Sequence, residues 1–385
     1  MQVAKGYKQT EVGVIPEDWD FSTAKNLCKV NQGLQISIEE RLTTPSPHSL
    51  KYITIQYLNN SKNVEYIDSF TESVCCSEDD VLMTRTGNTG IVVTDVKGVF
   101  HNNFFKISYR KDRLVKDYFV AYLRQEWMQQ LILTKAGTST IPDLNHSDFY
   151  SIPVIVPPFA EQEAIAEALS DADSLIESLQ QLIAKKRQIK QGAMQELLDP
   201  KDDWVEKSLG EISDCLDHLR VPLNGSEREG RVGDYPYCGA NGILGYIDDF
   251  CVNDSVILIA EDGGYFDEYL HRPIAYRMTG KFWVNNHAHI LKARTGIDQE
   301  YLFYNLVHKD IQKFLASGTR AKLNKSEMIK ITIHLPPTLT EQTRIATILS
   351  DMDDEITTLE TKLTKAQKIK QGMMSELLTG KTRLI

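Results

Sequence analysis

One stretch of the chain occurs twice, 180 residues apart. Positions 161–198 and 341–378 are identical at 19 of 38 places, and they end in nearly the same way, IKQGAMQELL and IKQGMMSELL. This agreement is far above chance, so the chain contains an internal duplication. A duplication constrains the fold more than any single motif, because both copies must form the same supersecondary unit.

Each copy has the pattern of a long amphipathic helix. Apolar residues recur at alternating steps of four and three, which is the seam of helices that supercoil around one another. Proline pairs at 157–158 and 336–337 predict the helix starts, and Pro200 and Gly380 predict the stops. Each helix could pack on its own domain, but two equivalent helices of this length favour pairing with each other. The seam positions are Ile165, Leu169, Ile176, Leu179, Ile183, Leu197, Ile345, Leu349, Ile356, Leu359, Leu363 and Leu377.

The segments between the helices are also related, but more faintly. Trp19 aligns with Trp204, and the asparagine pair at 102–103 aligns with the pair at 285–286. KDYFVAYL aligns with QEYLFYNL, and GTSTIPDLN aligns with GTRAKLN. Both segments contain β-branched and aromatic runs interrupted by glycine, which predicts α+β (mixed α/β) domains with irregular sheets. We expect a helix near 116–133 and another near 299–315.

The predicted organisation is therefore a globular domain followed by a long helix, repeated once. The predicted ranges are 1–158 and 201–337 for the two domains and 159–200 and 338–385 for the two helices.

Composition and charge limit the possible environments and partners. The net charge is −10, and no domain-sized segment is basic, so any contact with DNA must come from local patches or from another subunit. The six cysteines form no C-x-x-C pair, which indicates reduced thiols in a cytoplasmic protein without a zinc site. We expect no signal peptide and no membrane segment, because the apolar runs are short.

Four short motifs suggest catalysis or metal binding, and none is complete. VPPF at 156–159 is similar to the amine-binding motif of amino-methyltransferases, but Val156 and its counterpart Leu335 cannot accept a hydrogen bond from the amine. TGKT at 379–382 lacks the first glycine of a P-loop. Pro142-Asp143 begins a nuclease-like pattern with no following acid-x-lysine. The histidines of NNHAH lack a third metal ligand, so we expect no catalytic residue and no metal ligand in this chain.

Surface recognition is the remaining function. Basic clusters are typical of solvated faces or of phosphate contacts, whereas Arg, Lys, Asn and His side chains can read base edges. The candidate DNA-binding residues are Arg85, Asn88, Lys106, Arg110, Lys111, Arg113, Arg272, Arg277, Lys281, Asn285, His287, Arg320, Lys322 and Lys325.

The chain resembles the specificity (S) subunit of type I restriction–modification systems. The residues that carry the resemblance are GYKQTEVGVIPEDW near the start, IPVIVPPFAEQEAIAEALSDAD with its echo ITIHLPPTLTEQTRIATILSDMD, and the two IKQG segments. YPYCGANGILGYIDDF and FWVNNHAHILK also look like target-recognition sequence of that family. The resemblance covers the whole chain, including the order and doubling of its modules.

This resemblance implies a function and a set of partners. Each domain would read one half of a bipartite site on double-stranded DNA, and the helices would form an antiparallel coiled coil that sets the spacing. The resulting chain would have a pseudo-two-fold internal repeat. Two methyltransferase (M) subunits would dock on it and modify adenine with S-adenosylmethionine. Restriction (R) subunits, using ATP and Mg²⁺, would also join, and the chain itself would bind no cofactor.

Two other functions remain open from the sequence. A coiled-coil scaffold that binds only proteins would show no DNA affinity, or an affinity that does not depend on salt. A free-standing methyltransferase or nuclease would show activity from this chain alone.

Overall fold

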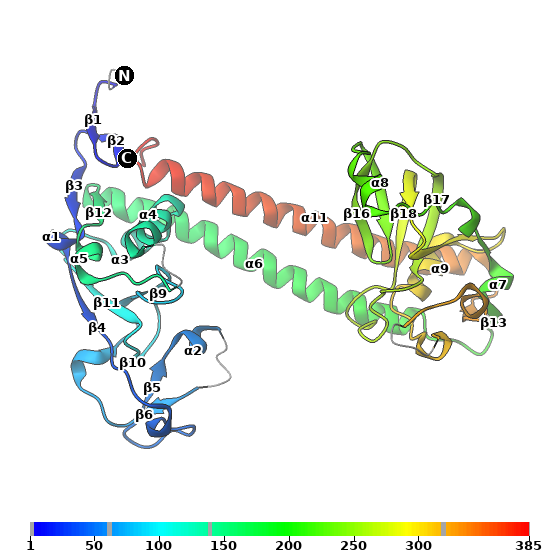
Figure 1. Ribbon diagram of the computed structural model, residues 1–385, viewed down its shortest axis with the longest axis horizontal. Helices are drawn as coiled ribbons and strands as arrows, with labels where there is room; N and C mark the ends of the chain where they lie inside the picture. The colour runs from blue at the N-terminus through cyan, green and yellow to red at the C-terminus, as the bar shows by residue number, and fades with distance from the viewer. Residues whose placement is uncertain (1–3, 60–63, 138–140, 317–320, 385) are drawn as a thin grey trace. The chain divides into compact units, whose positions relative to one another are not determined.

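The computed structural model describes residues 4–59, 64–137, 141–316 and 321–384, and it divides the chain into two compact units. The first unit comprises Met1–Leu179 and Lys362–Ile385, and the second comprises Gln180–Thr361. Two long helices, α6 (Phe159–Leu197) and α11 (Leu339–Leu377), each contribute to both units (Figure 1). The expected mixed α/β architecture with two long helices is confirmed.

The first unit contains several small sheets. Its central sheet has the order β4-β11-β8-β9, a second sheet has the order β6-β5-β10-β7, and β1-β2 and β3-β12 form antiparallel pairs. The strands are β1 (Tyr7–Thr10), β2 (Gly13–Pro16), β3 (Asp20–Thr23), β4 (Cys28–Gln32), β5 (Leu50–Ile53), β6 (Tyr66–Ile67), β7 (Cys75–Cys76), β8 (Val81–Thr84), β9 (Val92–Val93), β10 (Gly98–Phe100), β11 (Phe104–Tyr109) and β12 (Pro153–Val156). The helices are α1 (Ala24–Leu27), α2 (Ile55–Asn59), α3 (Lys116–Arg124), α4 (Glu126–Ala136) and α5 (His146–Tyr150), with short 3₁₀ turns at Ile38–Glu40 and Glu72–Val74.

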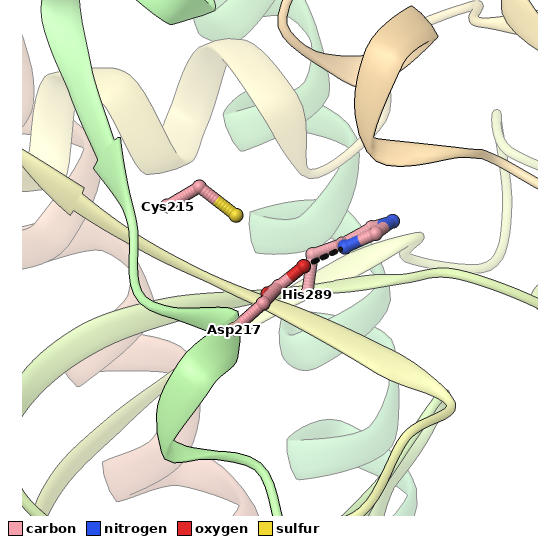
Figure 2. A group of neighbouring side chains, drawn as sticks. All are labelled: Cys215, Asp217 and His289. Carbon is pink, nitrogen blue, oxygen red and sulfur yellow. Dashed lines mark hydrogen bonds and ion pairs between the residues drawn. The ribbon is translucent and has the colours of Figure 1, made fainter.

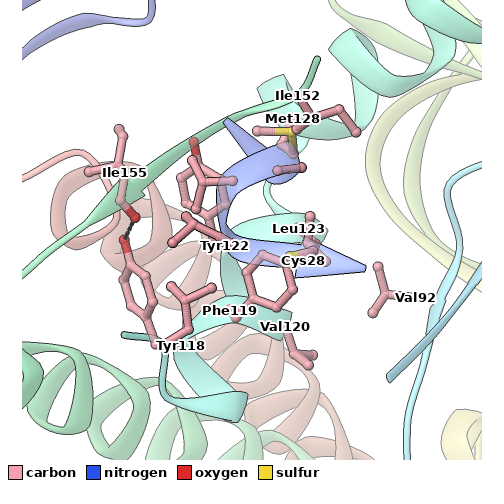
Figure 3. Close-up of a cluster of buried hydrophobic side chains, with 14 of the residues drawn as sticks. Cys28, Val92, Tyr118, Phe119, Val120, Tyr122, Leu123, Met128, Ile152 and Ile155 are labelled. Atoms are coloured by element: carbon pink, nitrogen blue, oxygen red, sulfur yellow. Dashed lines mark hydrogen bonds between the residues drawn. The ribbon is translucent and has the colours of Figure 1, made fainter. Parts of the chain in front are cut away.

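The core of the first unit lies where α3 and α4 pack against β12 and the central sheet (Figure 3). Tyr118 and Tyr122 are fully buried, and their hydroxyls donate to the carbonyl oxygens of Ile155 (3.0 Å) and Pro153 (3.1 Å). These bonds satisfy the phenol groups, which would otherwise be costly to bury. They also fix β12, the strand that leads into α6.

The second unit is built around one six-stranded sheet. Its order is β14-β19-β17-β18-β15-β16, and β13 and β20 form a separate antiparallel pair. The strands are β13 (Val205–Ser208), β14 (Ser213–Cys215), β15 (Tyr235–Gly239), β16 (Gly242–Ile247), β17 (Val252–Ala260), β18 (Ala275–Val284), β19 (Ala288–Ala293) and β20 (Thr332–Leu335). The helices are α7 (Leu209–Ile212), α8 (Gly225–Glu229), α9 (Gln299–Leu306) and α10 (Lys325–Met328), with 3₁₀ turns at Asp217–Leu219 and Gln312–Phe314.

The same anchoring bonds occur in both units. The hydroxyl of Tyr301 on α9 donates to the carbonyl of His334 on β20 (2.7 Å), as Tyr118 on α3 does to β12. The buried amide oxygen of Gln162, at the start of α6, accepts from the backbone N–H of Val115 (2.9 Å), which caps α3. Gln342, at the start of α11, accepts in the same way from Asp298, which caps α9 (3.0 Å). The duplication seen in the sequence is therefore a duplication of structure.

The two long helices pair antiparallel in each unit. Every predicted seam residue is buried or half-buried, and several of them belong to the cores of the units themselves. Lys370 of α11 pairs with Asp173 of α6 in the first unit (2.5 Å). In the second unit Lys190 of α6 pairs with Asp353 of α11. These two ion pairs are equivalent under the 180-residue repeat. Each helix has 39 residues, which at 1.5 Å per residue corresponds to a length of about 58 Å.

The smaller helices differ from the prediction. The helix expected over 116–133 is two helices, because Gln125 adopts extended backbone angles (φ −63°, ψ 141°) between α3 and α4. Its side chain donates to the carbonyl of Met374 on α11 (3.0 Å) and accepts from the Trp127 indole (2.7 Å). These tertiary contacts override a local pattern that favours one continuous helix. The helix expected over 299–315 ends early, at Leu306.

The start of α6 contains a charge that is completely buried. Glu161 is 0% exposed and accepts from the Trp19 indole (2.8 Å) and from the Arg383 guanidinium (2.6 and 2.7 Å). Arg383 also binds Asp18 and lies over the Trp19 ring. At the equivalent position of α11, Glu341 is only half-buried and pairs with the exposed Arg344, one turn away on the same helix (2.7 Å). The two copies therefore differ at this junction in how deeply the charge is buried.

We expect Arg383→Ala to destabilise the first unit by about 2–4 kcal/mol, because it leaves the Glu161 carboxylate buried without its cation. Arg344→Ala is the matched control and should cause no measurable change, because its ion pair is exposed. Urea unfolding followed by tryptophan fluorescence would measure both, and equal effects of the two substitutions would contradict the assignment.

Candidate nucleic-acid interface

Three loops meet in the first unit, beyond the end of the central strand β8. They are residues 85–91, 101–103 and 141–145, which we call the first loop cluster. The backbone N–H of Arg85 donates to the carbonyl of Asn103 (2.7 Å), and the N–H of Leu144 donates to the carbonyl of Arg85 (2.8 Å). Gly87 has φ +85°, which allows the tight turn that this position requires. The loops are thus fixed to each other through their backbones.

The second unit repeats this arrangement beyond the end of β17. Residues 261–264, 285–287 and 321–324 form the second loop cluster. Glu261 takes the place of Arg85: its N–H donates to the carbonyl of His287 (2.8 Å), and its carbonyl accepts from the N–H of Leu323 (2.7 Å). The buried leucines Leu144 and Leu323 anchor the third loop of each cluster. The backbone frame is therefore shared, while the side chains that it carries are different.

The first cluster presents a hydrogen-bonded set of polar side chains. The Arg85 guanidinium lies over the Phe105 ring and pairs with Asp143 (2.8 Å), whose carboxylate also accepts from the Thr86 hydroxyl (2.6 Å). The Asn88 side chain is exposed at the tip of the same turn. The predicted residues Arg85 and Asn88 thus lie together, beside Asp143.

The second cluster presents a different set. Lys322 pairs with Glu261 (2.9 Å), and the half-exposed His287 ring contacts Asp262 through Nδ1 (2.6 Å). The Asn285 side chain is buried, and its oxygen accepts from the His287 backbone N–H (2.8 Å), so it shapes the loop. Three predicted residues, Asn285, His287 and Lys322, meet here.

A buried charge network supports the second cluster. His289 on β19 is 1% exposed, with Nδ1 at 2.7 Å from the Asp217 carboxylate (Figure 2). Its Nε2 lies 2.7 Å from the Leu323 carbonyl oxygen. Both partners can accept hydrogen bonds, so the ring is held between two acceptors. Arg220 joins Asp217 (3.1 Å) to Glu261, which links this network to the loop that carries Lys322.

Cys215, Asp217 and His289 lie close enough together to be considered as metal ligands. Hydrogen bonds account for this group better, because both ring nitrogens of His289 already face acceptors. Burial also raises the pKa of the Cys215 thiol, which favours the neutral form over the thiolate that binds metals. The group is therefore best described as structural support for the loops.

The remaining basic candidates of the first unit lie elsewhere. Strand β11 starts opposite Thr84, next to the first loop cluster, and ends opposite Cys28, so residues 110–116 follow its far end. There Arg110 pairs with Asp112 (2.5 Å) and Arg113 with Asp20 (2.5 Å), while Lys111 is exposed. Lys106, in the middle of the strand, donates to the Cys75 carbonyl (2.7 Å).

The other candidates of the second unit are dispersed. Arg277 contacts Glu300, Asp353 and the Phe303 ring, so it faces the helices of its own unit. Arg272 lies over Tyr265, and Lys281 lies over Phe250. Lys325 is exposed at the start of α10, and Arg320 lies outside the described residues.

Sequence reasoning missed the acidic members of the clusters. Asp143, Glu261 and Asp262 carry the ion pairs, but a search for donors to DNA does not select carboxylates. A signal was present, because GTSTIPDLN and GTRAKLN align through their shared Leu-Asn and place Asp143 opposite Lys322.

Comparisons with known proteins agree with this duplicated architecture. The family model "Type I restriction modification DNA specificity domain" matches residues 16–187 and again 201–371. The type I restriction enzyme MjaVIII specificity subunit of Methanocaldococcus jannaschii is 24% identical over 96% of this chain and 94% of its own length. The EcoprrI specificity subunit of Escherichia coli is 26% identical over 46% of this chain and 42% of its own. The crystal structure of a type I restriction–modification S subunit from M. genitalium covers 98% of both chains, with a TM-score of 0.66 at 18% identity. Among the described residues, no helix is both long and apolar enough to cross a membrane.

The charge network leads to a prediction about pH. Burial tends to raise the pKa of Asp217, but the hydrogen bond and charge of His289, the Ile290 N–H and Arg220 outweigh it, so the pKa lies below its ordinary value. The resulting stability is present above the pKa of the unfolded chain, about 3.9, and is lost as the pH falls through the lower folded pKa. Asp217→Asn should lose about 2 kcal/mol at pH 7 and should show a smaller loss between about pH 5 and pH 3.

Thermal unfolding across this pH range would measure the effect. Asp214→Asn is the control, because Asp214 pairs with Arg294 at the surface (2.8 Å). If wild type and Asp217→Asn lost stability equally on acidification, Asp217 would not be the titrating group.

Proposed function

This chain belongs to the family of type I restriction–modification DNA specificity proteins, and we propose that it is the specificity subunit of a type I complex. Each unit reads one half of a bipartite target on double-stranded DNA. The observation that carries this proposal is the pair of loop clusters, which share one backbone frame and differ in their side chains. Two equivalent backbone frames would allow one chain to contact a DNA duplex at two places. Their different side chains would allow the two half-sites to differ in sequence.

The loop clusters supply the groups that read bases. The first cluster contributes Asn88, with Arg85 positioning the groups around it, and the second contributes His287 and Lys322, positioned by the buried Asn285. Arginine, lysine, asparagine and histidine donate to the base acceptors of the major groove. The remaining cations position the unit through phosphate contacts, which carry no sequence information. This second set comprises Lys106, Arg110, Lys111, Arg272, Lys281, Arg320 and Lys325, whereas Arg113 and Arg277 are paired within their own units.

The chemistry belongs to the partners. We propose that this chain is not catalytic, and that methyltransferase subunits modify adenine at N6 with S-adenosylmethionine. Restriction subunits cleave DNA in a reaction driven by ATP and Mg²⁺. The specificity subunit selects the DNA sequence at which both partners act.

Two identical partners need two equivalent surfaces, and the repeated IKQG segment provides them. Ile189 and Ile369 are equivalent, and their side chains are 46% and 52% exposed, which is unusual for isoleucine. Five residues further on, Met194 lines a groove of about 680 Å³ between the long helices and α9, and Met374 lines one of about 810 Å³ between α11 and the helices α3 and α4. We propose that one methyltransferase subunit docks at each of these surfaces.

The helices set the distance between the half-sites in this proposal, which can be tested. Inserting seven residues after Leu179 and seven after Thr361 keeps the seam in register and lengthens each helix by about 10 Å. We expect the spacer of the methylated target to lengthen by about three base pairs, at about 3.4 Å per base pair, with both half-sites unchanged.

Sequencing that maps N6-methyladenine would measure this in a host that expresses the chain with its methyltransferase. The wild-type chain should give a bipartite target, and methylation without one would refute the proposed function. Half-sites that change while the spacing stays constant would refute the role of the helices.

The docking surfaces lead to a second prediction. Ile189→Asp and Ile369→Asp should each reduce the bound methyltransferase from two copies to one, and the double substitution should abolish binding. Leu175→Asp is the control, since Leu175 is equally exposed (55%) but has Glu355 as its counterpart. Native mass spectrometry of the purified complex would count the copies. Two copies bound to the double variant would exclude this surface.

A further inference from the structure

The two loop clusters contain an ion pair at the same place with its charges reversed. In the first cluster Arg85 extends from the loop after β8 and pairs with Asp143. In the second, Glu261 extends from the loop after β17 and pairs with Lys322. The same isolated β-bridge accompanies each pair, between Thr86 and Asp143 and between Asp262 and Lys322. The residue that follows the central strand is the cation (Arg85) in the first unit and the anion (Glu261) in the second.

The two members of each pair differ in exposure. Arg85 and Glu261 are 15% and 12% exposed, and both are held by other groups: Arg85 by the Phe105 ring, and Glu261 by Arg220. Asp143 and Lys322 are 48% and 44% exposed. The less exposed member of each pair is therefore a fixed support, and the more exposed member is the group that the cluster presents. The first cluster presents a carboxylate, and the second presents an ammonium group.

These groups have opposite hydrogen-bonding capacity. The Asp143 carboxylate only accepts, and the donors from Arg85 and Thr86 leave part of its four-site capacity available. The Lys322 ammonium only donates, and its pair with Glu261 uses one of three N–H groups. In the major groove a carboxylate accepts from the amino group of cytosine, whereas an ammonium donates to O6 and N7 of guanine.

An exposed carboxylate is costly beside DNA, because it faces the charge of the phosphates. Arg85 offsets part of this repulsion by holding the carboxylate, and a base that offers an amino group offsets more. Bases without that group leave the repulsion uncompensated. Asp143 therefore suits discrimination between bases and does not suit general DNA affinity.

We propose that Asp143 and Lys322 are specificity-determining residues, one for each half-site. Asp143 selects an amino-bearing base, preferably cytosine, in the half-site read by the first unit. Lys322 selects guanine in the half-site read by the second unit. Arg85 and Glu261 are positioning residues that aim these groups. This inference rests on the proposed function and adds which residue in each unit reads which base edge.

The simpler alternative is that both ion pairs only fasten the loops. Ion pairs this exposed contribute little to stability. Loss of an ion pair that only holds the loops together would weaken methylation in general, but it would not change which base is accepted at one position. Base identity therefore separates the two explanations.

The experiment compares Asp143→Asn and Lys322→Gln in the complete complex, by mapping N6-methyladenine in the host. Asp143→Asn should relax one cytosine-containing position of one half-site by roughly 5- to 100-fold. Lys322→Gln should relax one guanine-containing position of the other half-site by a similar factor. Asp112→Asn and Lys330→Gln are matched controls, because both residues form surface ion pairs outside the clusters and should leave the target unchanged.

The outcomes are distinct. A bipartite wild-type target whose half-sites do not change in either variant would overturn this inference while leaving the proposed function intact. Relaxation of the same half-site by both variants would also overturn it. If a variant fails to fold, Asp143→Glu and Lys322→Arg keep the charge but move it, and each should change the preference at the same position. Unchanged half-sites in that second pair would likewise overturn the inference.

Discussion

The pairing of α6 with α11 is the contact on which both recognition units depend. Each helix carries a continuous apolar seam, and packing against the other helix and against the cores of the units removes the seam from water. Each repeat also contributes core residues to the unit formed mainly by the other repeat. Leu377 of the second repeat completes the core of the first unit beside Ile165, while Met194 and Leu197 of the first repeat pack against the core of the second unit. Neither unit has a complete core without residues from the other half of the duplication. The equivalent lysine–aspartate pairs fix the register, because a slip of one turn would separate both pairs at once.

This shared frame leaves the recognition loops free to differ. The contacts that hold each unit to its long helix are repeated. In each unit a tyrosine hydroxyl donates to the strand before the long helix, and a glutamine at the start of the long helix accepts from the residue that caps α3 or α9. The loop backbones are held by repeated N–H to carbonyl bonds that do not depend on side-chain identity. Substitutions in the loops therefore change what is presented without changing where it is presented. A cation at Arg85 and an anion at Glu261 occupy the same backbone position, and each finds its counter-charge on the same neighbouring loop.

The long helices and the overall organisation could be predicted from the sequence because their signals are local and periodic. A seam of apolar residues read every three or four positions needs no knowledge of the partner. The break at Gln125 could not be predicted, since its cause is a bond to Met374 on a helix 249 residues away. The loop clusters were predicted in part. Arg85, Asn88, His287 and Lys322 were identified as donors, whereas Asp143 and Glu261 have meaning only once three distant loops are brought together. Arg277 has the right chemistry for DNA, but its contacts with Glu300 and Asp353 depend on tertiary packing.

The same packing explains how an acidic chain can recognise DNA. Many of its cations are already paired within the protein: Arg113 with Asp20, Arg277 with Glu300, and Arg383 with Glu161. Such pairs contribute little net charge to a DNA surface, so the sequence-independent attraction of this chain for phosphates is expected to be weak. Weak general attraction has an advantage for a specificity protein, because discrimination is the difference between the correct site and all others. In the complex that we propose, partner subunits that bring basic surface would raise affinity at every site equally, and the loop clusters would decide which site is occupied.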